Sequence, residues 1–207
     1  MITIGVDNTL ELGSEAVQYI HSFAIKQGIH VHHIAPKEST IYRFSKIIAL
    51  KDYYHYLEEE GKTDILLIEL NKKGIETNIY KNLGFSIIVL FDENLKEEKC
   101  EHKTLNKYDL VEQLKAKYYI LPDTFKIKTK GCITYGWSQG ADISISSAEK
   151  TIEGLTELQC CIQTCIPSIK GSITMPVEFP VRANMNNVDS VLAGVATMLL
   201  YGFKINT

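Results

Sequence analysis

The hydrophobic pattern of the first 125 residues alternates between short apolar runs and segments of helical periodicity. Apolar residues recur three and four positions apart between Ala16 and Ile25, and Gly28 follows them, which predicts a helix and its end. The run at residues 64–70 is apolar on both faces, as is typical of a parallel strand covered on both sides. Similar short runs predict strands at residues 2–6, 29–34, 85–91 and 118–121.

The segments between these runs have the polarity of surface helices and loops. The tyrosine-rich stretch at residues 51–61 predicts a solvated helix after a short apolar run at 47–50. Residues 72–83 predict a helix or turn, and residues 105–117 predict a helix after a charged loop at 92–103. Strands that alternate with helices predict an α/β fold with a doubly wound, mostly parallel sheet.

The pattern changes after residue 126. Period-two alternation, with Gly154 and Gly171 near the turns, predicts a small antiparallel β subsheet from strands at residues 131–136, 141–147, 158–166 and 173–179. A helix with one apolar face is predicted from residue 187 to 201, and Gly202 ends it. We therefore expect a single domain over residues 1–207, made of a parallel part at 1–125, an antiparallel subsheet at 126–186 and a C-terminal helix at 187–207.

Composition excludes several classes of partner. The net charge of −3 at pH 7 lacks the basic excess of proteins that bind nucleic acids or anionic membranes. No apolar run reaches the roughly 18 residues that a membrane span needs, and residues 1–5 lead into a strand pattern without a signal-peptide signature. The five cysteines are an odd number, which favours reduced thiols in a cytoplasmic protein.

The ends of the predicted parallel strands carry polar residues. Asp7 and Asn8 follow the first strand, Glu69 stands near the end of the run at 64–70, and Asp92 follows the run at 85–91. Ligands of open α/β sheets bind at the carboxyl ends of the strands. These four residues are therefore the first candidates for a functional site.

Four segments of the chain have a recognisable order: TIGVDNTLE at residues 3–11, ILLIELNKKGI at 65–75, TYGWSQGADI at 134–143 and NNVDSVLAGVA at 186–196. They resemble T-G-T-N-G-K-T-T, E-x-S-S-x-G-L, T-Y-G-x-x-x-x-A-D-V and H-N-V-x-N-A-L-A-A-I-A, four landmarks of the central, ATP-binding domain of the Mur ligase superfamily. The third and fourth matches are the most specific. The resemblance spans nearly the whole chain and implies the fold of that domain, with no room for the family's substrate-binding and amino-acid-binding domains.

The resemblance also shows where the chain departs from the family's chemistry. Ligases of this family activate a carboxylate with ATP, and the lysine and hydroxyl of the phosphate-binding loop hold the phosphates and Mg²⁺. In this chain Asn8 replaces the second glycine, Thr9 the lysine and Leu10 the hydroxyl. The resemblance implies no catalytic residue, and it implies candidate nucleotide-binding residues at Gly5, Asp7, Asn8, Thr9 and Asn187.

Two matched residues have structural alternatives. Glu69 matches the family's Mg²⁺-contacting carboxylate, and it is the candidate metal ligand; alternatively it caps the strand end or pairs with a lysine. Asn187 matches the family's adenine-contacting asparagine; alternatively it caps the helix that follows it. The family's D-H-L-D segment corresponds to residues 92–99, which contain no histidine.

The remaining candidates are weaker. His30 and His32 share one face of a strand, but no third metal ligand is identifiable, so strand surface positions are expected for them and for His33. Trp137 either anchors a partner or packs over the subsheet. Buried free thiols are the default for Cys160, Cys161 and Cys165.

These observations favour a non-catalytic Mur ligase-like module with a structural or regulatory role. Its partner would be another protein or a second copy of the chain, and no cofactor is expected. The alternative is an ATP-dependent carboxylate–amine ligase that uses ATP and Mg²⁺, or a nucleotide-binding subunit of one. A third hypothesis is a sensor of anions or nucleotides without turnover.

Overall fold

The computed structural model describes residues 1–9, 12–35, 47–81, 83–92, 114–125, 130–151, 155–183 and 187–204. The described strands are β1 (Ile2–Asp7), β2 (Val31–Ile34), β3 (Ile65–Leu70), β4 (Phe85–Val89), β5 (Ala116–Pro122), β6 (Cys132–Tyr135), β7 (Ile143–Lys150), β8 (Thr156–Ile162), β9 (Ile166–Pro167), β10 (Ile173–Thr174) and β11 (Val177–Ala183). The described helices are α1 (Leu12–Lys26), α3 (Ile47–Glu60), α4 (Lys72–Glu76) and α6 (Val188–Tyr201).

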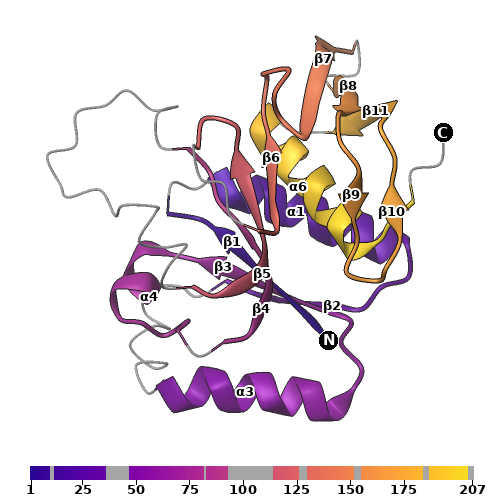
Figure 1. Ribbon diagram of the computed structural model, residues 1–207. Coiled ribbons are helices and arrows are strands. Elements are labelled where there is room, and N and C mark those ends of the chain that lie inside the picture. The colour runs from indigo at the N-terminus through magenta and orange to yellow at the C-terminus, as the bar shows by residue number, and fades with distance from the viewer. Residues whose placement is uncertain are drawn as a thin grey trace, which may run out of the picture.

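One sheet of nine strands organises the described part of the chain, in the order β11-β8-β7-β6-β5-β4-β1-β3-β2 (Figure 1). Neighbouring strands from β2 to β7 are parallel, whereas β8 pairs antiparallel with both β7 and β11. The strands β9 and β10 form a separate antiparallel ribbon. The prediction of an α/β fold with a mostly parallel sheet and a small antiparallel part is confirmed.

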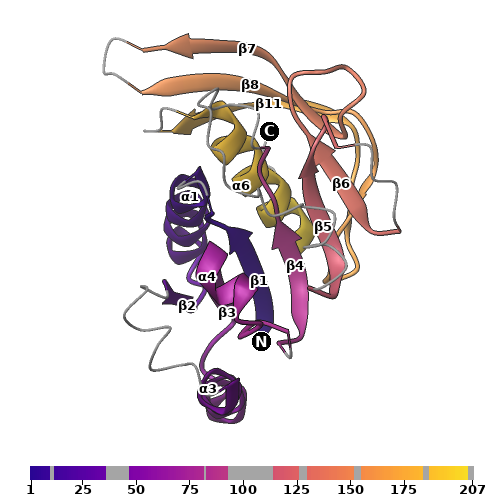
Figure 2. The ribbon, with the colours of Figure 1, turned by 90° about the vertical axis from the view of Figure 1, so that its left-hand side faces the viewer.

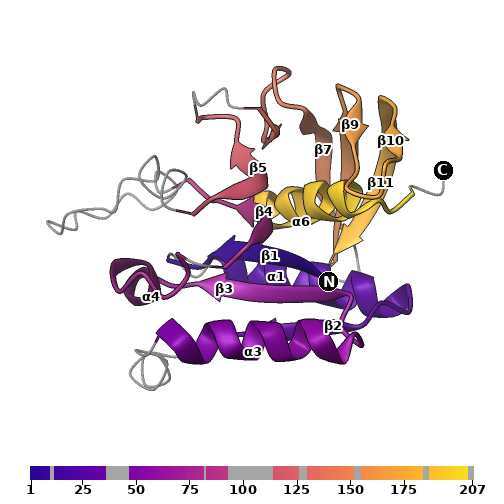
Figure 3. The same cartoon turned by 60° about the horizontal axis from the view of Figure 1, so that its bottom comes forward.

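Helices cover both faces of the parallel strands. The helix α3 lies on one face of β1 and β3, and α1 and α6 lie side by side on the other (Figures 1 and 3). Beyond β4 the sheet curves around α6, so that β7, β8 and β11 lie over that helix (Figure 2). Every residue of α6 from Ser190 to Tyr201 is buried, because this helix is apolar on nearly all sides and is enclosed between α1 and the curved sheet. The sequence predicted one buried, apolar face for this helix, whereas the structure buries its residues on every side from Ser190 onwards.

The predicted helix at 51–61 is present as α3, which begins at Ile47 and so includes the apolar run at 47–50; its Leu50 and Leu57 are buried against the sheet. Two other predicted features are wrong. The strand β6 is parallel to β5, so the antiparallel part begins at β7 and not at residue 126; alternation shows which face of a strand is buried but not its direction. Residues 116 and 117 of the predicted helix at 105–117 belong to β5, and residues 105–113 lie outside the described residues.

Candidate functional site

The parallel pairing of β1 with β3 brings together two of the predicted site segments. Val6 pairs with Glu69 and Asp7 with Leu70, so both strands end at the same level. The backbone N–H of Asn8 then donates to the carbonyl of Leu70 at 2.9 Å. Asn8 and Glu69, which are 61 residues apart, therefore lie side by side at the carboxyl edge of the sheet.

The side chain of Asn8 connects this edge to the first turn of α1. Its Nδ2 donates to Oε2 of Glu69 at 2.6 Å and to Oγ of Ser14 at 2.9 Å. Its Oδ1 accepts the backbone N–H of Ser14 at 3.2 Å. The first N–H groups of a helix lack partners within it and attract anions such as phosphates. In this chain the Oδ1 of Asn8 accepts a hydrogen bond from one of these N–H groups, that of Ser14.

Glu69 has a second partner on the neighbouring strand. Nε2 of His33, on β2, lies 2.8 Å from Oε1 of Glu69, and the two side chains are 32% and 14% exposed. The ring of His33 also lies near that of His21 on α1, with 6.3 Å between the centroids. Among the described residues Glu69 thus pairs with a histidine and an asparagine, whereas one of its structural alternatives was a lysine. A sequence pattern could not reveal this contact, because it depends on the register between β2 and β3.

The other predicted loop residues have local structural roles. Gly5 lies inside β1, where an added Cβ would stand 2.9 Å from Cε1 of Phe85, so the absence of a side chain permits close packing. The carboxylate of Asp7 accepts the backbone N–H of Thr9 at 3.1 Å. Residues 10 and 11 lie outside the described residues.

Carboxylates gather where β1, β4, β5 and the start of α6 meet. The hydroxyl of Tyr135 is buried there and donates to the carbonyl of Leu90 at 2.8 Å. Burial raises the pKa of Tyr135 well above its ordinary value, and the nearby carboxylates raise it further. These carboxylates belong to Asp189, Asp7, Asp92 and Asp123. An anionic ligand at this edge would meet their combined repulsion.

Asn187 is the N-cap of α6. Its Oδ1 accepts the backbone N–H groups of Asp189 and Ser190 at 2.9 and 3.3 Å. Its own N–H donates to Glu15 on α1 at 3.2 Å, and Ser190 Oγ donates to the carbonyl of Leu12 at 3.0 Å. The structural alternative for Asn187 is confirmed, and the cap also joins the starts of α6 and α1.

One of the two most specific sequence matches, at residues 134–143, contains a hydrogen-bonded junction. Oδ2 of Asp142 accepts from the N–H and the hydroxyl of Thr134 at 2.8 and 2.9 Å, and Oδ1 accepts from the hydroxyl of Thr164 at 2.7 Å. These contacts join β6 to the start of β7 and to the segment that follows β8. The threonine and aspartate of this match thus have a structural use in this chain.

Trp137 lies in the turn that follows β6 and is 61% exposed, so the expectation that it packs over the subsheet is wrong. The turn is held by Asp123, whose Oδ2 accepts the N–H of Ser138 at 2.9 Å. A Cβ at Gly136 would stand 2.3 Å from the Asp123 carboxyl carbon, and the φ of Gly136 is 156°, so only glycine fits this position comfortably. The exposed indole of Trp137 thus lies in a turn that is fixed on both sides by Asp123.

The remaining candidates do not form a metal site within the described residues. His32 Nε2 lies 2.7 Å from the hydroxyl of Tyr53, and no group of three or more His, Cys, Asp or Glu side chains there is arranged to hold a metal ion. Cys160 and Cys161 are buried free thiols as predicted, and burial raises the pKa of Cys160 to about 12. Cys165 is an exposed free thiol, against prediction.

Comparison with known proteins bears on the fold. The sequence matches no protein-family model and no curated protein. The solved structure of UDP-N-acetylmuramoyl-L-alanyl-D-glutamate–2,6-diaminopimelate ligase is similar, with a TM-score of 0.63 and 14% sequence identity. The chain has a Mur ligase-like fold. The similarity covers 99% of this chain and 44% of the ligase chain, so this chain spans less than half the length of that enzyme. Among the described helices of this Mur ligase-like chain, none has the length and apolarity to cross a membrane.

Proposed function

We propose that this chain is a non-catalytic Mur ligase-like domain that acts as a structural or protein-interaction module. The observation that supports it most directly is the position of the Asn8 side chain, which bonds both Glu69 and the Ser14 amide in the first turn of α1. A nucleotide-binding loop needs free N–H groups there for the phosphates. It also needs the carboxylate free for Mg²⁺.

Charge at the strand ends supports the same proposal. ATP carries several negative charges. A phosphate-binding loop stabilises them with a lysine and with Mg²⁺, which a hydroxyl of the loop binds. This chain has Thr9 and Leu10 at those positions. The carboxylates around Tyr135 add repulsion. Loss of a charge-assisted lysine contact alone removes about 1.5–3 kcal/mol of binding.

The test is thermal stability with and without millimolar Mg-ATP, joined to an assay of released phosphate. A ligand present at about 100 times its dissociation constant would add about 2.7 kcal/mol of stability. We expect no change in melting temperature and no phosphate release for the unaltered protein. A rise in melting temperature that disappears in Glu69→Ala would contradict the proposal and support the alternative, an ATP-dependent carboxylate–amine ligase or a nucleotide-binding subunit of one.

A variant that rebuilds the loop serves as the positive control. Asn8→Gly, Thr9→Lys and Leu10→Thr together restore the family's glycine, lysine and hydroxyl and release Glu69 and the Ser14 amide from Asn8. Stabilisation of this variant by Mg-ATP would show that the scaffold can still hold a nucleotide. If Mg-ATP stabilises this variant but not the unaltered chain, the three loop residues account for the loss of nucleotide binding.

A further inference from the structure

The two outer edges of the nine-stranded sheet differ in their capacity to pair. The strand β11 forms one edge and contains Pro180, which has no N–H to offer a further strand. The strand β2 forms the other edge, and no described strand pairs with its outer side. Its sequence, VHHI, contains no proline. The β2 edge therefore lacks the feature that protects the β11 edge.

The backbone of β2 shows which residues face outward. The carbonyl of His30 accepts the N–H of Ile65 at 3.1 Å, so the even-numbered residues of this segment direct their backbone groups towards β3. Alternate residues of a strand direct them to opposite sides. The N–H and C=O groups of Val31 and His33 consequently point away from β3, in position to bond an added strand.

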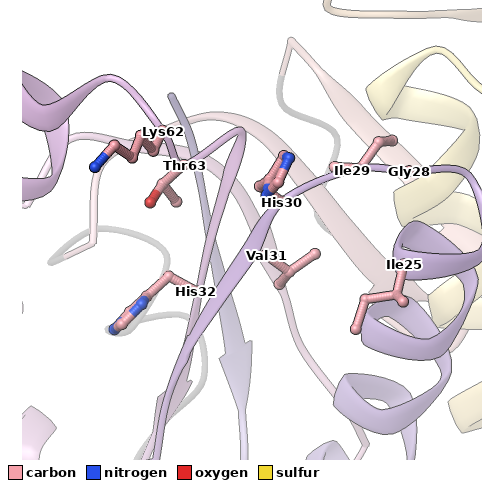
Figure 4. A pocket seen from close by; sticks show the side chains of 8 residues that line it. All are labelled: Ile25, Gly28, Ile29, His30, Val31, His32, Lys62 and Thr63. Carbon is pink, nitrogen blue, oxygen red and sulfur yellow. The ribbon is translucent and has the colours of Figure 1, made fainter.

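A surface depression of about 480 Å³ lies at the start of β2, lined by Ile25, Gly28, Ile29, His30, Val31, His32, Lys62 and Thr63. Figure 4 shows Ile25 and Val31 on one side of β2, and His32, Thr63 and Lys62 on the other. The first side is apolar, and Ile25 is 53% exposed there. The second side carries a lysine and a histidine, and none of the eight lining residues is acidic.

Chemistry differs between the two sides because the strand residues alternate. Val31 packs with the core beneath α1, whereas His32 bonds Tyr53 on α3. A strand added to β2 would place its successive side chains alternately on the α1 side and the α3 side. Its preferred sequence would thus alternate aliphatic residues, which cover Ile25, with carboxylates, which face His32 and Lys62. Lys62 already pairs with Glu60 at 2.9 Å, but that contact is exposed and weak, so it can exchange.

We propose that the outer edge of β2 is a docking site for an extended segment of a protein partner in which aliphatic and acidic residues alternate. Main-chain hydrogen bonds to Val31 and His33 would supply affinity, and the two unlike sides would supply specificity. The inference rests on the proposed function, because it names the surface through which a module without turnover would act.

The probe is a fluorescein-labelled seven-residue peptide of alternating valine and glutamate, followed by fluorescence anisotropy and by amide NMR shifts. We expect binding with shifts at Val31 and His33. A peptide of alternating valine and lysine should bind at least about tenfold more weakly, since charge reversal at an interface costs more than 1 kcal/mol. A valine–glutamate peptide with N-methylated valines should not bind, because it lacks half of its backbone donors.

Protein variants locate the site. Ile25→Glu should weaken binding about tenfold or more by placing a carboxylate on the apolar side. Ile173→Glu is the matched control, because Ile173 is similarly exposed, at 64%, but lies on β10; it should leave binding unchanged. Val31→Pro removes an outward N–H without touching the β3 ladder and should abolish binding while the melting temperature shows that the fold persists.

Four outcomes would overturn the inference: no binding of the valine–glutamate peptide, equal binding of the lysine peptide, equal losses in Ile25→Glu and Ile173→Glu, or dimerisation through β2 seen by sedimentation. The last would mean that a second copy occupies the edge. None of these outcomes concerns nucleotide binding, which the Mg-ATP experiment tests alone. Failure of this inference is therefore distinguishable from failure of the proposed function.

Discussion

The amide nitrogen of Asn8 lies 2.6 Å from a carboxylate oxygen of Glu69, at the carboxyl edge of the parallel strands β1 and β3. This contact links the β1–α1 loop to β3. Asn8 is uncharged, so the contact is not an ion pair; it gives Oε2 of Glu69 a hydrogen-bond donor, while His33 lies against Oε1. The same asparagine accepts the N–H of Ser14, so one side chain joins β3 to the first turn of α1.

Replacement of Asn8 should destabilise the fold. We expect Asn8→Ala to lower the free energy of unfolding by about 1–3 kcal/mol, because it leaves the Ser14 amide and part of the Glu69 carboxylate without their partner. Urea unfolding followed by circular dichroism measures the change. The matched control is Asn71→Ala, which removes another asparagine cap, whose Oδ1 accepts the N–H of Gly74 in α4 at 2.7 Å. A smaller loss in Asn8→Ala than in the control would contradict the importance of the Glu69 contact.

Variants of Asn187 distinguish a role in capping α6 from a role in binding a nucleotide. As the cap of α6 it bonds two backbone amides, so Asn187→Ala should destabilise the fold by about 1 kcal/mol. Asn187→Ser and Asn187→Asp keep a capping oxygen and should recover most of that loss. An adenine contact would instead require the amide group, and aspartate would not replace it. Thermal unfolding of the three variants, each with and without Mg-ATP, distinguishes the two roles.

Much of the fold was predictable because strands and helices leave local signals. Apolar runs marked β1, β3 and β4, and the Asn187 and Gly202 signals marked both ends of α6. The candidate site was predictable only in part. Asn8 and Glu69 could be placed at one edge from the parallel order of the strands, but the contact of Glu69 with His33 requires the β2–β3 register. The direction of β6 and the exposure of Trp137 also depend on distant pairing, which a local pattern does not contain.

Packing between α1 and α6 depends on a glycine. A Cβ on Gly194 would stand 2.5 Å from Cδ1 of Tyr19, so the two helices approach too closely for any side chain there. We expect Gly194→Ala to lower the free energy of unfolding by about 1–3 kcal/mol through overpacking. Gly84→Ala is the control, because a Cβ there meets nothing within 4 Å, and it should be neutral or slightly stabilising. Equal effects of the two substitutions in thermal unfolding would exclude a close helix contact.

The carboxylates at the strand ends predict how stability changes with pH. Burial raises the pKa of Asp189, and the neighbouring Asp123 and Asp92 raise it further. A carboxyl group whose pKa is higher in the folded than in the unfolded protein holds its proton longer when folded. Its contribution to stability therefore falls as the pH rises through the folded-state pKa, and the penalty is absent below the unfolded-state pKa, where both states are protonated.

Asp189→Asn should consequently be more stable than the unaltered protein at neutral pH, since it removes a charge that the fold disfavours. The difference should shrink as the pH is lowered towards the ordinary range of an aspartate pKa. The N-terminus of α6 acts in the opposite direction, because it attracts a negative charge in its first turn. Urea unfolding at a series of pH values decides between the two effects. A variant that is less stable at neutral pH would mean that the attraction of the helix N-terminus exceeds the cost of burial and of the neighbouring carboxylates.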